Sequence, residues 1–186
     1  MELEIVKYGH PALRSKGARI ASITPDLLQL IEDMIDTMVA AEGVGLAAQQ
    51  IGRPLQLCVI DIAGISDRPS RMWISGDEVN PDDHMPLVLI NPEVTTSGKP
   101  ESGIEGCLSF PGLSASITRP AKVAVTATNP MGRTISFEAT GLLARAVLHE
   151  NDHLQGVLFI DHMTAQDRRK VASALNEFLA DSAGIA

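Results

Sequence analysis

The segment HENDHLQG, residues 149–156, holds side chains whose types and spacing could do chemistry. In a helix, His149 and His153 lie four positions apart and so share one face, with Glu150 beside them. Two imidazoles and a carboxylate are the minimum for a site where a metal ion activates water. A catalytic metal usually takes three protein ligands, so the pattern predicts a third ligand elsewhere in the chain.

Glu150 has a different predicted role from that of the two histidines. In sites of this kind the glutamate does not bind the metal; it accepts a proton from the activated water and passes it to the leaving amine. The metal lowers the pKa of that water toward about 7, which makes hydroxide available at neutral pH. The pattern therefore indicates a metal-dependent hydrolase.

Candidates for the third ligand lie on both sides of this segment. Downstream, a zincin-type peptidase would use a histidine at position 159, but the sequence has Phe159 there, which leaves His162, Asp161 and the more distant Glu177. Upstream, Cys107 lies in EGCLS, residues 105–109, just before a Pro-Gly turn. A thiolate is a strong ligand for divalent iron, cobalt, nickel or zinc. The glycine before it and the loop setting favour Cys107 as a ligand over a second buried thiol.

Two helices are predicted around these residues, and a third follows them. Residues 24–43 have Thr24 as N-cap, Pro25 at the first helical position and one apolar stripe. In residues 141–156, Leu142 and Ala146 continue the stripe of the two histidines, so the metal ligands face the core. Thr164 opens a last helix, running to about residue 180, whose apolar face comprises Val171, Leu175, Phe178 and Leu179.

Strand patterns fill the middle of the chain. Residues 55–62 predict a buried strand in which Cys58 is an inert core thiol. A strand at residues 86–95 is expected to end at SGKPESG, residues 97–103, and three short strands are expected at 115–120, 121–129 and 133–140. Residues 65–86 are polar and indicate a long surface excursion that either covers the site or decorates the surface. The order predicts an α+β fold with antiparallel sheets.

Composition narrows the class of protein. The chain has 186 residues, which predicts a single domain spanning 1–186. A net charge of −8 and a pI near 5.0 argue against nucleic-acid binding. Two cysteines cannot make a disulfide framework, the N-terminus has no secretory signal, and no run is long enough to cross a membrane. We therefore expect a cytoplasmic protein.

Three segments, GVGLAAQQ (43–50), EGCLS and HENDHLQG, together resemble the three motifs of peptide deformylases, and residues 8–14 resemble the N-terminal segment of that family. By this resemblance Cys107, His149 and His153 bind the metal, and Glu150 is the general base and acid. The oxyanion hole would be formed by Gln50 and the backbone N–H of Leu108. The substrate-binding positions implied are Val44, Gly45, Glu105, Gly106, Leu142 and Ala146.

The resemblance also implies a reaction and its participants. The reaction is hydrolysis of the formyl group from N-formylmethionine at the start of new polypeptides, which releases formate. It implies one divalent metal ion, with Fe2+ as the native metal and Zn2+, Ni2+ or Co2+ able to replace it. The implied fold has antiparallel sheets packed around the helix that carries HExDH, with a C-terminal helix. A deformylase-like binding protein without turnover is the alternative, but Glu150 and Gln50 are intact.

Partners follow from that reaction. Formyl-Met nascent peptides emerge at the ribosome, so transient ribosome contact is expected, with no membrane and no direct reading of nucleic acid. Arg168, Arg169 and Lys170 are a candidate contact, although a solvated start of the last helix is the simpler interpretation.

Four further residues carry expectations of their own. Some family members have an arginine seven residues after the metal cysteine, where this chain has Ser114, so substrate preference is expected to differ. Arg145 replaces a commonly apolar residue on the motif helix and predicts a more polar pocket wall. We also expect Arg119 and Asp152 to form a buried ion pair that braces the metal helix.

Overall fold

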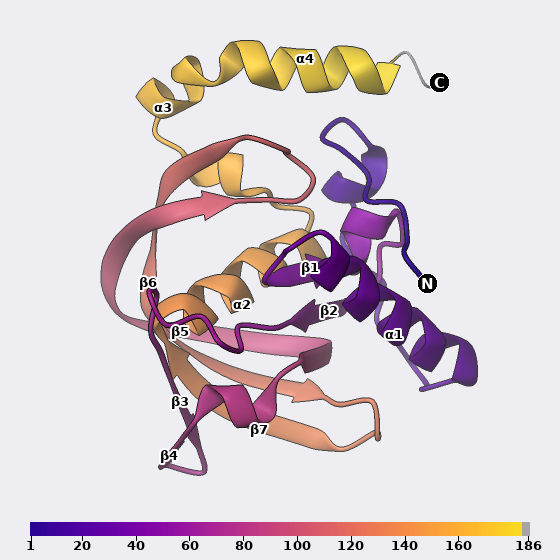
Figure 1. The fold of residues 1–186 in the computed structure, drawn as a ribbon, viewed down its shortest axis with the longest axis vertical. Coiled ribbons are helices and arrows are strands. Elements are labelled where there is room, and N and C mark those ends of the chain that lie inside the picture. Colours follow the sequence, from indigo (N-terminus) through magenta and orange to yellow (C-terminus); the bar gives the residue numbers. More distant parts are fainter. Residues whose placement is uncertain (184–186) are drawn as a thin grey trace.

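The computed structural model describes residues 1–183, and side chains through residue 180. A seven-stranded antiparallel sheet wraps around one central helix (Figure 1). The strands are β1 (Gly45–Ala47), β2 (Leu57–Ile60), β3 (Ser70–Ile74), β4 (Asp77–Val79), β5 (Leu87–Gly106), β6 (Ser114–Thr128) and β7 (Thr134–Thr140). The helices are α1 (Pro25–Ala40), α2 (Gly141–Leu154), α3 (Ala165–Lys170) and α4 (Ala172–Ala183), with 3-10 turns η1 (Pro11–Arg14), η2 (Ala48–Ile51), η3 (Pro81–His84) and η4 (Phe159–His162).

The sheet order is β1-β2-β5-β6-β7-β3-β4, and every pairing is antiparallel. Helix α2 contacts strands β1, β2, β3, β5, β6 and β7, so the curved sheet surrounds the helix that carries the histidines. The α+β class with antiparallel strands around this helix is confirmed. A turn at residues 129–132 joins β6 to β7.

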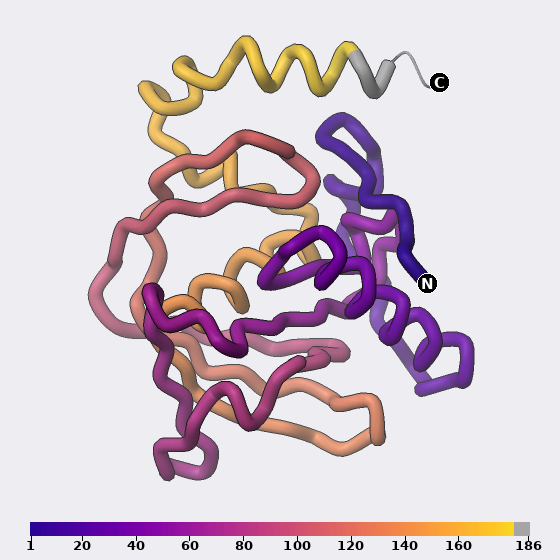
Figure 2. Tube along the Cα trace, viewed as in Figure 1, coloured from indigo at the N-terminus to yellow at the C-terminus, as the bar shows by residue number. Residues whose placement is uncertain are grey.

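Two strands are longer than the sequence suggested. The expected end at residues 97–103 is wrong, because β5 continues through this segment with a register shift between Ser97 and Pro100. The two short strands expected at 115–120 and 121–129 are one strand, β6. Pro100 lies opposite Pro120, so two residues without N–H groups face each other and neither leaves a partner unpaired. This long hairpin bends away from the sheet and over α2 (Figure 2).

Residues 65–86 lie mostly at the surface, as expected, but they form strands that their sequence pattern did not indicate. The segment contains the hairpin β3–β4, and β3 pairs with β7, so the excursion extends the sheet at the edge opposite β1. These strands are five and three residues long and mostly not fully buried. They therefore lack the alternation by which a half-buried strand is recognised, and pairing with β7 defines them instead.

The helices start where their caps predict. Thr24 Oγ1 accepts a hydrogen bond from the Leu27 N–H at 3.2 Å, and α1 buries Met34 and Met38 completely against the sheet. The predicted last helix is instead two helices, α3 and α4, which meet at Val171. Its expected apolar face is confirmed at Leu175, which is buried, but Leu179 is 44% exposed and does not belong to the core.

Candidate functional site

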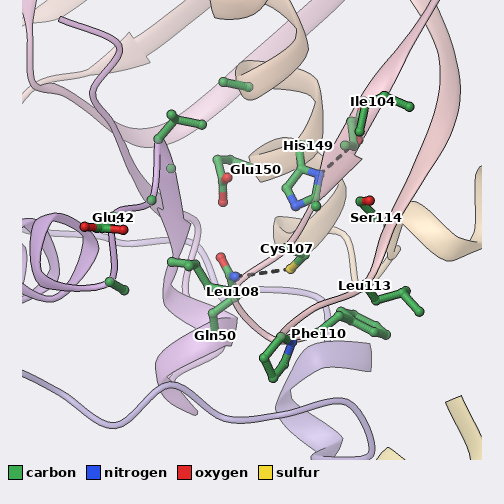
Figure 3. Close-up of a pocket in the computed structure, with 18 of the residues that line it drawn as sticks. Glu42, Gln50, Ile104, Cys107, Leu108, Phe110, Leu113, Ser114, His149 and Glu150 are labelled. Carbon is green, nitrogen blue, oxygen red and sulfur yellow. Dashed lines mark hydrogen bonds and ion pairs between the residues drawn. The ribbon is translucent and has the colours of Figure 1, made fainter. Parts of the chain in front are cut away.

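Helix α2 and the end of strand β5 bring three ligand atoms together. His149 and His153 project from α2, and Cys107 follows the last residue of β5, so residues 42 or more positions apart meet here. Figure 3 shows Cys107 and His149 of this group. One ligand atom from each of the three residues lies within 4.8 Å of the other two. The Cys107 Sγ atom is 3.3 Å from His153 Nε2. This spacing suits a single metal ion held by one thiolate and two imidazoles.

The surroundings of these three residues also fit a cation. The pKa of His153 is lowered well below its ordinary value, mainly by burial and then by the charge of His149, which favours the neutral imidazole that binds metals. Burial would lower the pKa of His149 too, but hydrogen bonds with Cys107 and Glu105 raise it well above the ordinary value. The contacts with Cys107 and Glu105 therefore favour a positive charge at the point where the three ligand atoms converge.

Two of the downstream ligand candidates, Asp161 and His162, lie in other interactions, and Glu177 does not belong to the cluster. Asp161 pairs with Arg14, with 3.0 Å between Arg14 Nη2 and Asp161 Oδ1, and His162 Nε2 is 2.8 Å from Asp152 Oδ2. Within residues 1–180, the group Cys107, His149 and His153 is the one set of three such side chains that converges on a point. Cys107, and none of the downstream residues, therefore completes the histidine pair.

Glu105 anchors the metal-facing side of β5 to its neighbours. Its carboxylate receives two hydrogen bonds from Arg119, at 2.6 and 2.9 Å, and one from Arg145 at 2.8 Å. Its Oε2 atom also lies 3.1 Å from His149 Nδ1, so Glu105 orients the imidazole with its Nε2 toward Cys107. Burial alone would raise the pKa of Glu105, but the hydrogen bonds from His149 and Arg119 lower it, so the carboxylate is charged.

The expected ion pair between Arg119 and Asp152 is present, with 2.8 Å between Nη1 and Oδ2. Arg119 is only 5% exposed and binds Glu105 and Asp152 at once. It therefore joins β6, the end of β5 and helix α2 through one guanidinium. The sequence indicated the Asp152 contact but not the stronger one to Glu105, because the register of the β5–β6 hairpin places Glu105 and Arg119 on one face.

Glu150 lies beside the three ligand atoms without belonging to them. It is 3% exposed, and its Oε2 atom is buried with no hydrogen-bond partner among the described residues. Burial raises its pKa to about 7. An unpaired buried carboxylate oxygen is rare in folded proteins and requires an explanation, which a water molecule or a substrate in the cavity would supply.

Gly45 determines where the Glu150 carboxylate can lie. A Cβ atom added at Gly45 would be 2.3 Å from Glu150 Oε1 and 2.8 Å from its Cδ. A real Cβ atom does not stand at such distances, so an added side chain would displace the Glu150 side chain or the strand. Gly45 therefore permits the close approach of β1 to α2.

Gln50 and Leu108 face the ligand atoms from the opposite side. The Gln50 Oε1 atom accepts a hydrogen bond from the Ala47 N–H at 2.8 Å, and this fixes the orientation of the amide. Its Nε2 atom consequently points at Cys107 Sγ, 3.4 Å away. The Leu108 carbonyl accepts from Lys7 Nζ at 3.1 Å, while no described group accepts from the Leu108 N–H. Two N–H donors are therefore available near the thiol.

These residues open into a cavity of about 650 Å³. Figure 3 shows Ile104 and Ser114 on one side of it and Glu42 on the other. The predicted substrate positions all line it, namely Val44, Gly45, Glu105, Gly106, Leu142 and Ala146. Arg145 lines the cavity as well, but hydrogen bonds to Glu105, the Ile117 carbonyl and the Glu101 carbonyl occupy its guanidinium.

The cavity also has lining residues that sequence reasoning missed. Lys7, Glu42, Arg68 and Ile104 all contribute to its wall or rim. Lys7, Glu42 and Ile104 each directly precede a segment that resembles the family, so their position beside a motif could have indicated them. Arg68 is far from any motif, and only the folded arrangement brings it to the site.

Among residues 1–183, no helix combines the length and the apolar character that a membrane span requires.

Comparison with known proteins gives matches over nearly the whole chain. Residues 2–169 match the family model described as polypeptide deformylase. A peptide deformylase of Methylacidiphilum infernorum is 45% identical over 95% of this chain and 93% of its own length. One from Opitutus terrae is 41% identical over 92% of this chain and 90% of its own length.

Solved structures agree with these sequence matches. The structure of a peptide deformylase from Synechococcus elongatus in complex with actinonin has a TM-score of 0.76 and 37% identity, covering 97% of this chain and 86% of that one. A peptide deformylase from Legionella pneumophila has a TM-score of 0.79 and 34% identity, covering 98% of both chains. The similarity therefore extends to both the sequence and the fold.

Proposed function

Because this chain belongs to the polypeptide deformylase family, we propose that it hydrolyses the formyl group from the N-terminal formylmethionine of newly made polypeptides and releases formate. The observation that carries this proposal is the cluster of Cys107, His149 and His153 beside the buried, unpaired carboxylate of Glu150. A cluster of this kind is a site for water activation, and the cavity next to it has room for the start of a peptide.

The metal site is assigned to Cys107, His149 and His153, with Glu105 orienting His149 through its Nδ1 atom. When bound there, a divalent ion would act as a Lewis acid and lower the pKa of water. We propose Fe2+ as the native ion, with Zn2+, Ni2+ or Co2+ as replacements, since a thiolate and two imidazoles accept all four.

Glu150 would move the proton in the reaction. Its free Oε2 atom takes a proton from the attacking water as the water oxygen bonds to the formyl carbon. When the carbon–nitrogen bond breaks, Glu150 gives that proton to the departing amine of methionine, and the former water oxygen leaves with formate. The burial of Glu150 keeps bulk water away from this transfer.

Gln50 and Leu108 would stabilise the charge that develops on the formyl oxygen. Gln50 Nε2 is aimed by the hydrogen bond from Ala47, so the amide is oriented toward the ligand atoms before the reaction begins. The Leu108 N–H has no acceptor among the described residues and is a second donor. One such preorganised donor is worth roughly 3 kcal/mol at the transition state.

The substrate's methionine side chain would enter the apolar part of the cavity, formed by Val44, Leu142 and Ala146. Gly45 and Gly106 would lie along the peptide backbone, since neither carries a side chain that would obstruct it. Glu105 contributes by fixing this end of β5. Arg145 keeps the pocket wall polar only in part, because Glu105 neutralises its charge.

We also propose a location and partners for the protein. It would be a cytoplasmic enzyme with one catalytic domain that meets its substrates as they leave the ribosome. Arg168, Arg169 and Lys170 at the end of α3 are the candidate contact, since all three are exposed.

A deformylation assay tests the proposed function. The protein, purified without oxygen with Fe2+ or with Ni2+ substituted, is incubated with formyl-Met-Ala-Ser, and formate is measured. We expect formate release that is abolished when a chelator removes the metal and restored when the metal is returned. Formate release no faster than in buffer, by protein with a loaded metal site, would refute the assignment.

A further inference from the structure

A second cavity of about 510 Å³ adjoins the metal-site cavity. The two share Arg68, Ile104, Gly106, Leu142 and Arg145 in their walls, so they are continuous along the end of strand β5. The second cavity extends from there toward residues 101–103 and the start of α2. A peptide bound at the metal site therefore has room for further side chains on this side.

Positive charge dominates the wall of the second cavity. Arg68, Arg119 and Arg145 line it, against the single carboxylate of Glu101. Arg119 is bound to Glu105 and Asp152, and Arg145 is bound to Glu105, so these two carboxylates compensate the two charges within the protein.

Arg68 differs from the other two arginines. Its side chain is exposed, and Nη2 donates one hydrogen bond, to the Ile104 carbonyl at 3.3 Å. No carboxylate pairs with Arg68 in the part of the chain whose side chains are described. It belongs to the segment that leads into β3, so the hairpin that looked like a surface excursion delivers one cation to the rim of the site.

The geometry of an extended peptide indicates which substrate residue reaches Arg68. Alternate side chains of a strand point to the same face and are about 6.6–6.8 Å apart. If the methionine side chain enters the first cavity against Leu142 and Ala146, the second side chain points away and the third points inward again. A peptide that starts at Cys107 and runs past Gly106 toward Ile104 then places its third side chain at the second cavity, beside Arg68.

We infer that Arg68 is a specificity-determining residue that favours substrates with a carboxylate side chain, aspartate or glutamate, at the third position. The inference rests on the proposed deformylase function. The protein's net charge of −8 does not prevent this preference. Salt screens charges that lie more than roughly 8 Å from the substrate, so a cation in direct contact with the substrate has the larger effect. An exposed ion pair of this kind changes binding by about two- to fivefold.

The test compares the peptides formyl-Met-Ala-Glu, formyl-Met-Ala-Gln and formyl-Met-Ala-Lys, each with its C-terminal carboxylate blocked. In the wild type we expect kcat/KM to fall in that order, with a Glu/Lys ratio of about two to five at low salt that decreases toward one as salt is added. The difference should lie in KM, because Arg68 contacts a part of the substrate far from the reacting atoms.

Variants of Arg68 identify the residue responsible. Arg68→Ala should bring the Glu/Lys ratio to about one, Arg68→Glu should invert it, and Arg68→Lys should largely retain it. The matched control is Arg133→Ala, which removes the same charge from the exposed turn before β7 and should keep the wild-type ratio. A ratio that is the same in the wild type and in Arg68→Ala would overturn the inference. So would an acidic preference at the second substrate residue and not the third.

The neutral peptide separates this inference from the proposed function. If wild-type protein with its metal does not hydrolyse formyl-Met-Ala-Gln, the deformylase assignment itself fails. If it hydrolyses that peptide but does not distinguish glutamate from lysine at the third position, the role of Arg68 alone is refuted.

Discussion

At the scale of single residues, the absence of a side chain at one position matters to the site as much as the ligand side chains do. Gly45 has no side chain, and only for this reason can the Glu150 carboxylate lie against strand β1. Cys107, His149 and His153 could be predicted from their types and spacing, because ligand chemistry restricts both. The hydrogen bond from Ala47 that aims Gln50 could not be predicted, because it depends on the path of the chain between β1 and η2.

Replacement of Gly45 by alanine tests the close contact with Glu150. The added Cβ would lie 2.3 Å from Glu150 Oε1, so the carboxylate or the strand must move by about an ångström. Misplacement of that size costs roughly 100-fold in rate, and we expect such a fall in kcat/KM with the metal content unchanged. Kinetics on formyl-Met-Ala-Ser, beside elemental analysis of the same samples, measures this. Activity within twofold of wild type would show that Glu150 need not be held there.

At the scale of elements, one guanidinium joins the parts that carry the metal ligands. Arg119 in β6 binds Glu105 at the end of β5 and Asp152 in α2. The sequence predicted the helix and its buried face from the spacing of apolar residues. It did not predict the continuous strands β5 and β6 or the β3–β4 hairpin, because pairing between strands overrides the local Gly, Pro and Ser residues.

Replacement of Arg119 by methionine should be strongly destabilising. It leaves the carboxylates of Glu105 and Asp152 without their main partner, and loss of one member of a buried ion pair costs about 3–5 kcal/mol. Urea unfolding of wild type and variant in the same metal state measures the free energy of unfolding.

The matched control is Arg71→Met, which removes an exposed arginine from a pair with Glu78. Pairs of that kind contribute roughly 0–1 kcal/mol. If the two variants were destabilised equally, burial of the Arg119 network would have no special energetic role.

The turn η4 provides a test that depends on pH. Burial alone would raise the pKa of Asp161, but hydrogen bonds from Arg14 and the Leu158 N–H lower it below its ordinary value of 3.8. A carboxyl whose pKa is lower in the folded state stabilises the protein above the unfolded pKa, and this contribution is lost as the pH falls through the folded pKa. The free-energy difference between wild type and Asp161→Asn should therefore be constant from pH 7 to about 5 and shrink below about pH 4. A difference that does not change in acid would contradict the pairing.

At the scale of the whole molecule, segments far apart in the sequence form one site. The sheet curves around α2, and this brings together residues 43–50, 105–109 and 149–156. These are the three segments that resemble the family's motifs. The α+β class followed from the order of helix and strand patterns. The strand order did not, because the five predicted strand patterns allow many antiparallel arrangements. That the chain forms a single domain stays a prediction.

The residues that line the cavity could likewise be predicted only in part. The expected metal ligands and base followed from residue types and spacing, and the expected oxyanion donors followed only from the family resemblance. Arg68 on the rim could not be predicted, because no motif lies near it and it reaches the cavity only through the segment before β3. Spacing does not distinguish one divalent metal from another at this site, since the same three ligands bind several.

The central claim is that Cys107 completes the metal site and that Glu150 acts on the substrate without holding the metal. Metal content and formate release, measured together for wild type, Cys107→Ser and Glu150→Gln, test it most directly. We predict about one ion per chain in wild type and in Glu150→Gln. Formate release should fall by about 10²–10⁴ in Glu150→Gln, and both properties should be lost in Cys107→Ser. Wild-type metal content and activity in Cys107→Ser would contradict the account.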